Sequence, residues 1–321
     1  MSNSNYITKV ALVGATGNSG SFMAEALLKT GKHTVTVLTR ASSKSKLPEG
    51  AIPKIIDYEK LDTLVEALKG QEALVITMKS QVKEAESKLI TAAAEAGVKW
   101  IMPNEWCPDS TNEGLRNDVF IYPPREASRK LVRDLGISNY ICLSTGFWYE
   151  WSLAIAPAFG IDLLHHAATL FDEGETKITV STWPQVGRAV AGILSLPIKP
   201  EGSNPEACLE NLANRVVYIK SFTVSQKEML ESAFRVTNTK ESDWTISKES
   251  SHQRYSNGMK EMKEGHLEGF IKMLYTRVFY PDGTGDIENK GTINDLLELP
   301  EEDMDEATKA AIQRAKSTTS Q

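Results

Sequence analysis

The amino-acid sequence predicts an α/β protein built on a doubly wound, parallel sheet. Two observations carry this prediction. Over the first half of the chain, short and nearly continuous apolar runs alternate with amphipathic segments of helical periodicity. A glycine-rich turn directly follows the first apolar run. Strands covered by helices on both faces are apolar along their whole length, so this alternation favours a parallel sheet between two helical layers.

Six strands and the helices between them follow from the alternation. The first three helices are each closed by a glycine after the last turn, at Gly31, Gly70 and Gly97. The expected strands are 9–15, 33–40, 51–57, 72–78, 99–103 and 138–144, and the expected helices are 19–31, 60–70, 81–97 and 124–136. The 321-residue chain is long enough for such a domain and an appended lobe or second domain.

The stretch Val10–Gly20 reads VALVGATGNSG and places glycines at Gly14, Gly17 and Gly20. In a βα unit, the first glycine permits the tight turn, the second lets a pyrophosphate approach the backbone, and the third allows close packing of helix on strand. The free amides at the helix start then face the phosphates. Because the turn joins a strand to a helix in the first βα unit, it predicts a dinucleotide-binding loop. Further candidate donors in this loop are Thr16, Asn18 and Ser19.

The end of the second predicted strand indicates which dinucleotide binds. An acidic residue about 20 positions after the glycines would hold the ribose of NAD, whereas an arginine accommodates the 2′-phosphate of NADP. This chain has Arg40 there. A guanidinium matches phosphate geometry, so the sequence predicts NADP(H) rather than NAD(H). Ser42 and Lys46 are further candidates, although a solvated loop explains Lys44 or Lys46 equally well.

Composition and charge argue against several other classes of protein. The formal net charge is −6 with both signs interspersed, so we expect no nucleic-acid partner. A polar start and the lack of an apolar stretch of about 18 residues predict no signal peptide and no membrane span. Three widely separated cysteines are typical of reduced thiols, and the adjacent His165 and His166 do not form a metal-binding pair. We therefore expect a cytoplasmic protein, monomeric or homodimeric, that acts on a small molecule without a metal.

Further stretches of the sequence resemble a known family. These are VLTRASSK, the loop at Asp57, LITAAAEAGVKWIMPNEWCPD and GFWYEWSL. Together with GATGNSG they resemble the NmrA-like and isoflavone-reductase-like group of atypical short-chain dehydrogenases, and most of all its fungal members. The later segment TWPQVGRAVAGILSLP is similar to the family's strand-to-helix return to the cofactor domain. The resemblance covers residues 7–235 and is most specific over Leu89–Asp109.

The resemblance implies a Rossmann-type domain that binds NADP(H), over residues 1–150 with a return segment near 178–197. A smaller C-terminal α/β lobe, over 151–177 and 198–321, would close over the substrate. Reductases of this group pass hydride from NADPH to aromatic or conjugated metabolites, and regulatory members bind the dinucleotide without turnover. We expect a reductase, with a role in secondary metabolism. A redox-sensing regulator and a redox-neutral isomerase or lyase that keeps NADP bound are the alternatives.

The proton donor of such a reductase has two candidates. Ordinary short-chain dehydrogenases pair a tyrosine with a lysine four residues later, but Tyr122 has Glu126 at that distance. The isoflavone-reductase branch uses a lysine on the helix before the sixth strand, and alignment puts Arg129 there with Lys130 beside it. Because arginine rarely gives up its proton, we expect Lys130 or His166 to serve. The alternative is that Lys130 is an ordinary surface residue.

The carboxyl ends of the middle strands supply the remaining cofactor candidates, since ligands bind at this edge of a doubly wound sheet. Thr77 and Met78 end the fourth strand and Asn104 follows the fifth, and we expect all three to contact the cofactor. The neighbouring Glu105 is explained equally well as a structural carboxylate.

An aromatic cluster near the same edge is the candidate substrate wall. Trp106 follows the fifth strand, and Phe147, Trp148 and Tyr149 follow the sixth. Such rings could stack a planar substrate. They could equally form apolar core between two lobes.

Overall fold

The computed structural model describes residues 4–79 and 83–319. Its central strands are β1 (Lys9–Val13), β2 (Thr34–Arg40), β3 (Ile52–Ile56), β4 (Ala73–Ile76), β5 (Trp100–Met102), β6 (Asn139–Ser144) and β11 (Arg215–Tyr218). They form one seven-stranded sheet in the order β11-β6-β5-β4-β1-β2-β3, with all neighbours parallel. The strand order reverses between β1 and β4, which places the ligand-binding switch point of a doubly wound sheet there.

Helices cover both faces of this sheet. On one face, α1 (Asn18–Lys29) packs against α8 (Trp183–Ser195). On the other face, α2 (Leu61–Leu68), α3 (Lys83–Glu95) and α5 (Pro123–Leu135) form a second layer. The two layers explain why the strands are apolar throughout, because each face of the sheet is buried.

Alternate residues of β1 enter the two layers. Val10 and Leu12 join the apolar cluster beneath α1 and α8, whereas Ala11 and Val13 join the cluster beneath α2 and α3. Close packing of α8 on α1 requires a residue without a side chain at Gly187. A Cβ there would lie 2.5 Å from a backbone oxygen of α1.

The predicted doubly wound α/β fold is confirmed, with one correction to its extent. All six expected strands and the four expected helices are present, and the sheet has a seventh strand, β11. We expected residues 198–321 to lie wholly in the C-terminal lobe. Instead, the short helix α9 (Leu209–Leu212) and β11 return to the central sheet, where β11 pairs with β6. A single helical turn before a four-residue strand carries too little periodicity to be recognised.

The C-terminal lobe contains two small sheets and a set of helices. One sheet has the order β12-β10-β7 and the other β13-β9-β8. Their strands are β7 (Phe147–Trp148), β10 (Ile178–Ser181), β12 (Phe222–Val224), β8 (Ile161–Asp162), β9 (Ala167–Phe171) and β13 (Thr245–Glu249). The helices of this half are α4 (Glu113–Asp118), α6 (Tyr149–Leu153), α7 (Ala156–Phe159), α10 (Gln226–Thr237), α11 (Ser251–Lys263), α12 (Leu267–Thr276) and α13 (Met304–Thr319), with 3-10 turns at Glu241–Asp243, Arg277–Phe279 and Glu288–Lys290.

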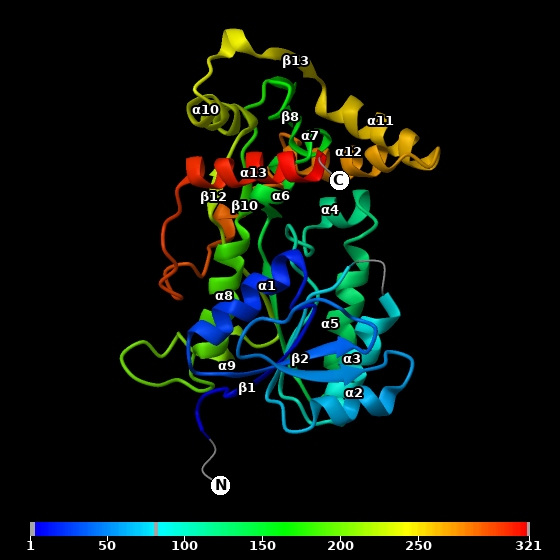
Figure 1. The fold of residues 1–321 in the computed structure, drawn as a ribbon, viewed down its shortest axis with the longest axis vertical. Coiled ribbons are helices and arrows are strands. Elements are labelled where there is room, and N and C mark those ends of the chain that lie inside the picture. Colours follow the sequence, from blue (N-terminus) through cyan, green and yellow to red (C-terminus); the bar gives the residue numbers. More distant parts are fainter. Residues whose placement is uncertain (1–3, 80–82, 320–321) are drawn as a thin grey trace.

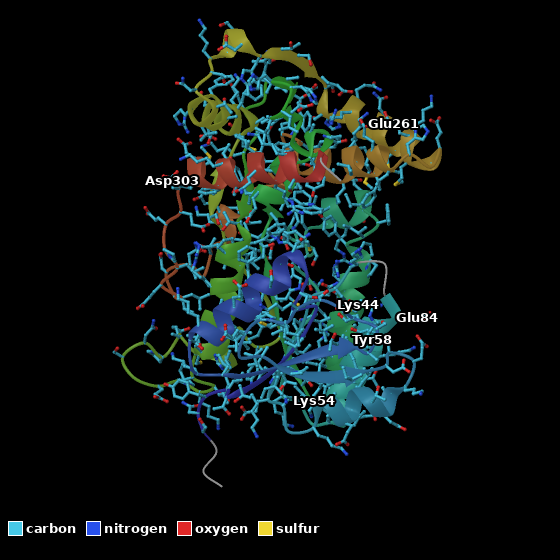
Figure 2. The ribbon with its side chains drawn as sticks, viewed as in Figure 1. Lys44, Lys54, Tyr58, Glu84, Glu261 and Asp303 are labelled. Carbon is cyan, nitrogen blue, oxygen red and sulfur yellow. The ribbon has the colours of Figure 1, made fainter. Side chains whose placement is uncertain are left out.

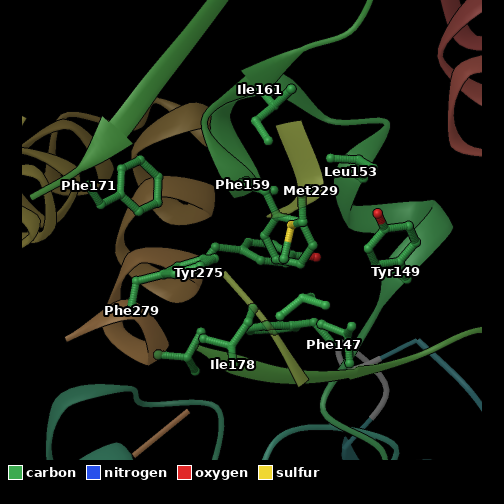
Figure 3. Packing of buried hydrophobic residues seen from close by; sticks show 14 of the residues in the cluster. Phe147, Tyr149, Leu153, Phe159, Ile161, Phe171, Ile178, Met229, Tyr275 and Phe279 are labelled. Carbon is green, nitrogen blue, oxygen red and sulfur yellow. The ribbon is translucent and has the colours of Figure 1, made fainter. Parts of the chain in front are cut away.

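The lobe has its own aromatic core, separate from the two layers of the central sheet. Figure 3 shows Phe159 among neighbouring rings of this core. Its ring meets Tyr275 and Phe279 edge-on at centroid distances of 5.8 and 5.7 Å. The last helix, α13, packs on α6 and α10 (Figure 1). Among the residues that the structure describes, no helix combines the length and the apolar character needed to cross a membrane.

Candidate functional site

The glycine turn after β1 is shaped by contacts that leave no room for side chains. Gly14 has φ +84°, and a Cβ there would lie 1.7 Å from the carbonyl oxygen of Thr77. A Cβ on Gly20 would lie 2.1 Å from the carbonyl oxygen of Gly14. The amide of Gly17 donates to that same oxygen at 2.9 Å. The turn is therefore a rigid cradle built from backbone, as the glycine spacing predicts.

The start of α1 is open to an anionic ligand. Gly17 caps the helix without a side-chain hydrogen bond, and the first turn contains no acidic residue. Thr16, Gly17 and Asn18 are exposed. The free amides of this first turn can therefore bind phosphate oxygens. Ser19, in contrast, is buried, and its hydroxyl lies 3.2 Å from that of Thr77, so both side chains tie the turn to the end of β4.

Arg40, at the end of β2, lines a hollow of about 850 Å³. The hollow lies between the loops after β2 and β3 and the first turns of α3, and Figure 2 labels Tyr58 and Glu84 at this end of the sheet. Burial raises the pKa of the Tyr58 phenol, and the positive charge of Arg40 opposes that shift. The residues that line the hollow are Arg40, Ala41, Ser42, Ile55, Ile56, Asp57, Tyr58, Glu59, Thr63, Glu84, Ala85 and Lys88. Arg40 and Ser42 thus lie where they were predicted.

Lys88 and Tyr58 also line the hollow beside Arg40, although the sequence did not identify them as candidates. Lys88 lines the hollow and forms an ion pair with Glu59 at 3.0 Å. Because β3 lies beside β2 in the sheet, the loop after β3 faces Arg40. The strand order is the signal that could have pointed to Tyr58. Lys46 is exposed and does not line the hollow.

The ends of β4 and β5 are joined by a reciprocal pair of hydrogen bonds. The side-chain amide of Asn104 donates to the carbonyl of Met78 at 2.8 Å, and the amide of Met78 donates to the Asn104 side-chain oxygen at 3.1 Å. Glu86 accepts from the backbone amide of Asn104 at 2.9 Å, and burial raises the pKa of this carboxyl. Asn104 and Met78 therefore hold together the backbone segments that follow β4 and β5.

The first turn of α5 brings two further polar groups to this edge. Arg125 donates to the backbone carbonyl of Asn104 at the end of β5. Tyr122, the residue before α5, is 1% exposed and belongs to the same apolar cluster as Cys107 and Phe147. In the sequence, Tyr122 lacks the lysine four residues later that marks an ordinary short-chain dehydrogenase, and no motif marks Arg125.

Neither predicted proton donor lies at the edge. The Lys130 side chain is 65% exposed and pairs with Asp134 one turn along α5, so its ammonium faces solvent. His166 lies in the turn between β8 and β9, with φ +50°, and stacks on Trp244 at 4.9 Å. Figure 1 places β8 and β13 at the end of the lobe away from the central sheet. Both predictions are therefore wrong in their placement: the segment after α6 runs outward and does not return over the cofactor edge.

Arg129, next to Lys130, is buried in a structural ion pair. Arg129 and Glu105 are each 2% exposed in their side chains and form an ion pair, with Ser110 bonded to both. Burial alone would lower the pKa of Arg129, but Glu105 and Glu126 outweigh it and raise that pKa. Glu105 is therefore a structural carboxylate, which was one of its two expected roles.

Three of the four predicted substrate aromatics are core residues. The indole of Trp106 donates to the carbonyl of Ile76 at 2.8 Å and fixes the loop after β5. Tyr149 is fully buried, and its hydroxyl lies 2.8 Å from that of Thr308. Figure 3 shows Phe147 and Tyr149 inside the lobe core.

Trp148 is the partly accessible member of that aromatic set. It is half-buried, its ring centroid lies 6.0 Å from that of Trp183, and its indole nitrogen has no hydrogen-bond partner among the described residues. Trp183 in turn stacks on Phe22 of α1, also at 6.0 Å. Trp148 therefore lies at the junction of lobe and sheet.

The geometry is that of a nucleotide-binding edge, and comparison with known families agrees with it. The NmrA-like family matches residues 7–193, which is more than half of the 321-residue chain. The chain belongs to the NmrA-like family. This membership confirms the predicted resemblance.

Relatives of this NmrA-like protein include an enzyme from a fungus and two proteins of known structure. The oxidoreductase aprR of Aspergillus flavus is 29% identical over 306 residues, or 93% of this chain and 96% of that protein. Isoflavone reductase is similar in structure with a TM-score of 0.70, 19% identity, and coverage of 94% of this chain and 98% of that chain. The NADPH-dependent quinone oxidoreductase QOR2 of Escherichia coli has a TM-score of 0.66, 20% identity and the same coverage, 94% and 98%. At these identities the two structures show a shared fold.

Proposed function

We propose that this NmrA-like protein is an NADPH-dependent oxidoreductase that reduces a small aromatic or conjugated metabolite by hydride transfer. The observation that carries the proposal is the edge from the Gly14–Gly20 cradle to Arg40. Its two halves lie at the ends of adjacent parallel strands, β1 and β2. That is the arrangement in which a doubly wound sheet holds a dinucleotide.

The residues present fit NADP(H). The cradle excludes any Cβ at Gly14 and Gly20, so the backbone can approach a pyrophosphate closely. The open first turn of α1 supplies amide donors. Arg40 is exposed, and no described residue forms an ion pair with it, so its guanidinium is available to a 2′-phosphate beside Ser42. Bound NADPH would supply the hydride, and these groups would hold it.

The relatives support the substrate class. Isoflavone reductase is named for an aromatic acceptor, and QOR2 for NADPH and a quinone. In this chain, the half-buried Trp148 offers an aromatic face at the lobe junction. An indole face of this kind stacks on a planar acceptor and excludes water from its surface.

The test is a calorimetric titration of the protein with NADPH, NADP+ and NADH. Wild-type protein should bind NADPH more tightly than NADH. Arg40→Ala should weaken NADPH binding about tenfold to hundredfold, toward the NADH value, because a charge-assisted hydrogen bond to the 2′-phosphate is lost. Arg215→Ala, which removes the same charge from the exposed start of β11, is the matched control and should leave NADPH binding unchanged.

Two results would contradict the proposal. Equal affinity of the wild-type protein for NADPH and NADH would remove the preference assigned to Arg40. If the protein bound none of the three dinucleotides, the cradle would be only a structural turn, and the proposed reductase would be abandoned.

A further inference from the structure

Among the described residues, several buried polar atoms near the carboxyl edge of β5 lack hydrogen-bond partners, and two of them are donors. These two are the hydroxyl of Tyr122 and the Nε of Arg125, whereas the third, Oε2 of Glu105, belongs to the carboxylate that Arg129 neutralises. Leaving such groups unpaired in the interior is unfavourable, so most buried polar groups have partners and each exception needs an explanation. Binding sites are one setting in which unpaired donors persist, because the ligand completes them.

The two groups come from one face of one helix turn. Tyr122 caps the start of α5 and Arg125 follows three residues later, the spacing that puts side chains on the same side of a helix. Arg125 is anchored to the Asn104 carbonyl at the end of β5, and Tyr122 packs in the cluster that contains Cys107 and Phe147. Backbone contacts of Cys107 with Ser144 and Thr145 join this corner to the end of β6. The pair therefore lies at the edge where an open α/β sheet binds its ligands.

We propose that Tyr122 is the proton donor of the reductase, and that Arg125 stabilises the negative charge that develops on the acceptor oxygen. The proposal rests on the proposed function, since it assigns chemistry to the acceptor side of that same reaction. It replaces Lys130 and His166, which lie elsewhere.

Bound NADPH would supply a hydride with both of its electrons to the acceptor carbon, where the new C–H bond forms as the π electrons of the acceptor move to its oxygen. The O–H bond of Tyr122 then breaks and its proton goes to that oxygen. The resulting tyrosinate lies within the electrostatic reach of Arg125 and takes a proton from water. The acceptor is thereby reduced by two electrons, and the protein is unchanged.

The surroundings suit this division of roles. Burial raises the pKa of the Tyr122 phenol well above its ordinary value, so the phenol keeps its proton at neutral pH until negative charge develops on the acceptor oxygen. Arg125 acts in the opposite direction on that pKa and favours the ionised phenol after transfer. An arginine itself gives up no proton, so it serves as a fixed positive charge and hydrogen-bond donor.

The pair also narrows the class of acceptor. The Tyr122 hydroxyl and the Arg125 guanidinium, on the same turn of α5, suit an acceptor whose oxygen gains negative charge as hydride arrives. Quinones, enones and aryl ketones are acceptors of this kind. An isolated alkene has no oxygen to receive the proton and would gain nothing from the pair.

The test uses p-nitrophenol, whose anion mimics the charged acceptor oxygen and whose visible absorption reports its ionisation. The probe is titrated into the NADP+-saturated protein at a pH below its solution pKa. We expect bound probe to absorb as the anion. Tyr122→Phe and Arg125→Gln should each weaken its binding by about tenfold or more, because each removes a donor to a charged oxygen. Tyr149→Phe removes another buried hydroxyl, paired with that of Thr308, and should bind the probe like wild type.

Each outcome decides the proposal. Failure of the wild-type protein to bind the anion, or equal binding by wild type, Tyr122→Phe and Arg125→Gln, would overturn it. Because the Tyr122 hydroxyl has no partner among the residues that the structure describes, Tyr122→Phe should unfold at the same temperature as wild type, and a marked loss of stability would instead assign the hydroxyl a structural role. NADP+ binding is measured separately on the same samples, so failure of the proposed cofactor is recognised independently of the acceptor site.

Discussion

The two ends of the central sheet's carboxyl edge are constructed differently. The nucleotide end, formed by the Gly14–Gly20 cradle and Arg40, consists of backbone and one exposed cation at the ends of the adjacent strands β1 and β2. The acceptor end, around Tyr122 and Arg125, is assembled from the ends of β5 and β6, the start of α5 and the C-terminal lobe. Close backbone approaches, within the glycine turn and between Gly14 and Thr77, define the first end, and side-chain packing between several elements defines the second.

This difference teaches that the two ends tolerate change unequally. A backbone cradle is intolerant of any added atom, because nothing in it can rotate away. Side-chain assemblies can exchange one donor for another provided that the packing around them is kept. A family can therefore keep one way of holding its cofactor while its acceptor chemistry varies.

The largest expected effect comes from adding one methyl group to the cradle. Gly14→Ala would place a Cβ 1.7 Å from the Thr77 carbonyl oxygen at a φ of +84°. We expect the free energy of unfolding to fall by more than about 5 kcal/mol, or the protein not to fold at all. Chemical denaturation followed by circular dichroism measures it. Gly31→Ala is the control, because Gly31 also has a positive φ of +66° but no atom within 4 Å of an added Cβ. Equal losses in the two variants would show that conformation alone, without the Thr77 contact, makes the position sensitive.

Breaking the buried ion pair behind the acceptor end should have the next largest effect. Arg129→Met keeps most of the volume but leaves the Glu105 carboxylate buried without its cation. We expect a loss of about 3–5 kcal/mol in the free energy of unfolding, measured by urea denaturation. The double variant Glu105→Gln with Arg129→Met removes both charges and should recover most of that loss. A single variant as stable as wild type would mean that the hydrogen bond from Ser110 suffices to hold the Glu105 carboxylate.

The same contrast explains which parts of the fold and site could be predicted. The glycine spacing, the residue at the end of β2 and the apolar alternation are local in sequence, and they predicted the cradle, Arg40 and six strands of the sheet. Tyr58 and Lys88 could be found only from the strand order. The strand β11 could be found only by knowing that a distant segment, Arg215–Tyr218, returns beside β6, which no local periodicity encodes.

The errors at the acceptor end have a specific physical origin. Arg129 and Lys130 are neighbours on α5, yet one side chain is 2% exposed and the other 65%, because consecutive residues on a helix point in directions about 100° apart. The lysine position of the isoflavone-reductase branch aligns with Arg129. Choosing the next residue, Lys130, was therefore enough to select a surface lysine. His166 was chosen on the assumption that the chain turns back over the cofactor, a path that only the packing of β8 and β9 determines.

A pH-dependent effect of intermediate size is expected where the lobe meets the sheet. Burial raises the pKa of the Glu150 carboxyl from 4.5 to about 7, and its Oε1 accepts from the amide of Trp183 at 2.7 Å. The unfolded chain ionises this group above 4.5, whereas the folded chain does so only near 7, so its contribution to stability is lost as pH rises through that window. Glu150→Gln removes the titration. The variant should gain about 3 kcal/mol relative to wild type between pH 4.5 and pH 8. Urea denaturation across pH measures the difference, and a constant difference between the two proteins would contradict the assignment.

The smallest expected effect separates core aromatics from acceptor-site aromatics. Tyr149 is fully buried, its ring meets Phe222 edge-on at 5.3 Å, and its hydroxyl pairs with Thr308. Tyr149→Phe keeps the ring and removes one buried hydrogen bond, so the free energy of unfolding should fall by about 1 kcal/mol. Binding of NADPH and of p-nitrophenol should be unchanged, because the residue belongs to the lobe core. Calorimetry of both ligands beside denaturation measures this. A loss of p-nitrophenol binding without a loss of stability would return Tyr149 to the acceptor site, and would show that the lobe core and the acceptor end are one continuous structure.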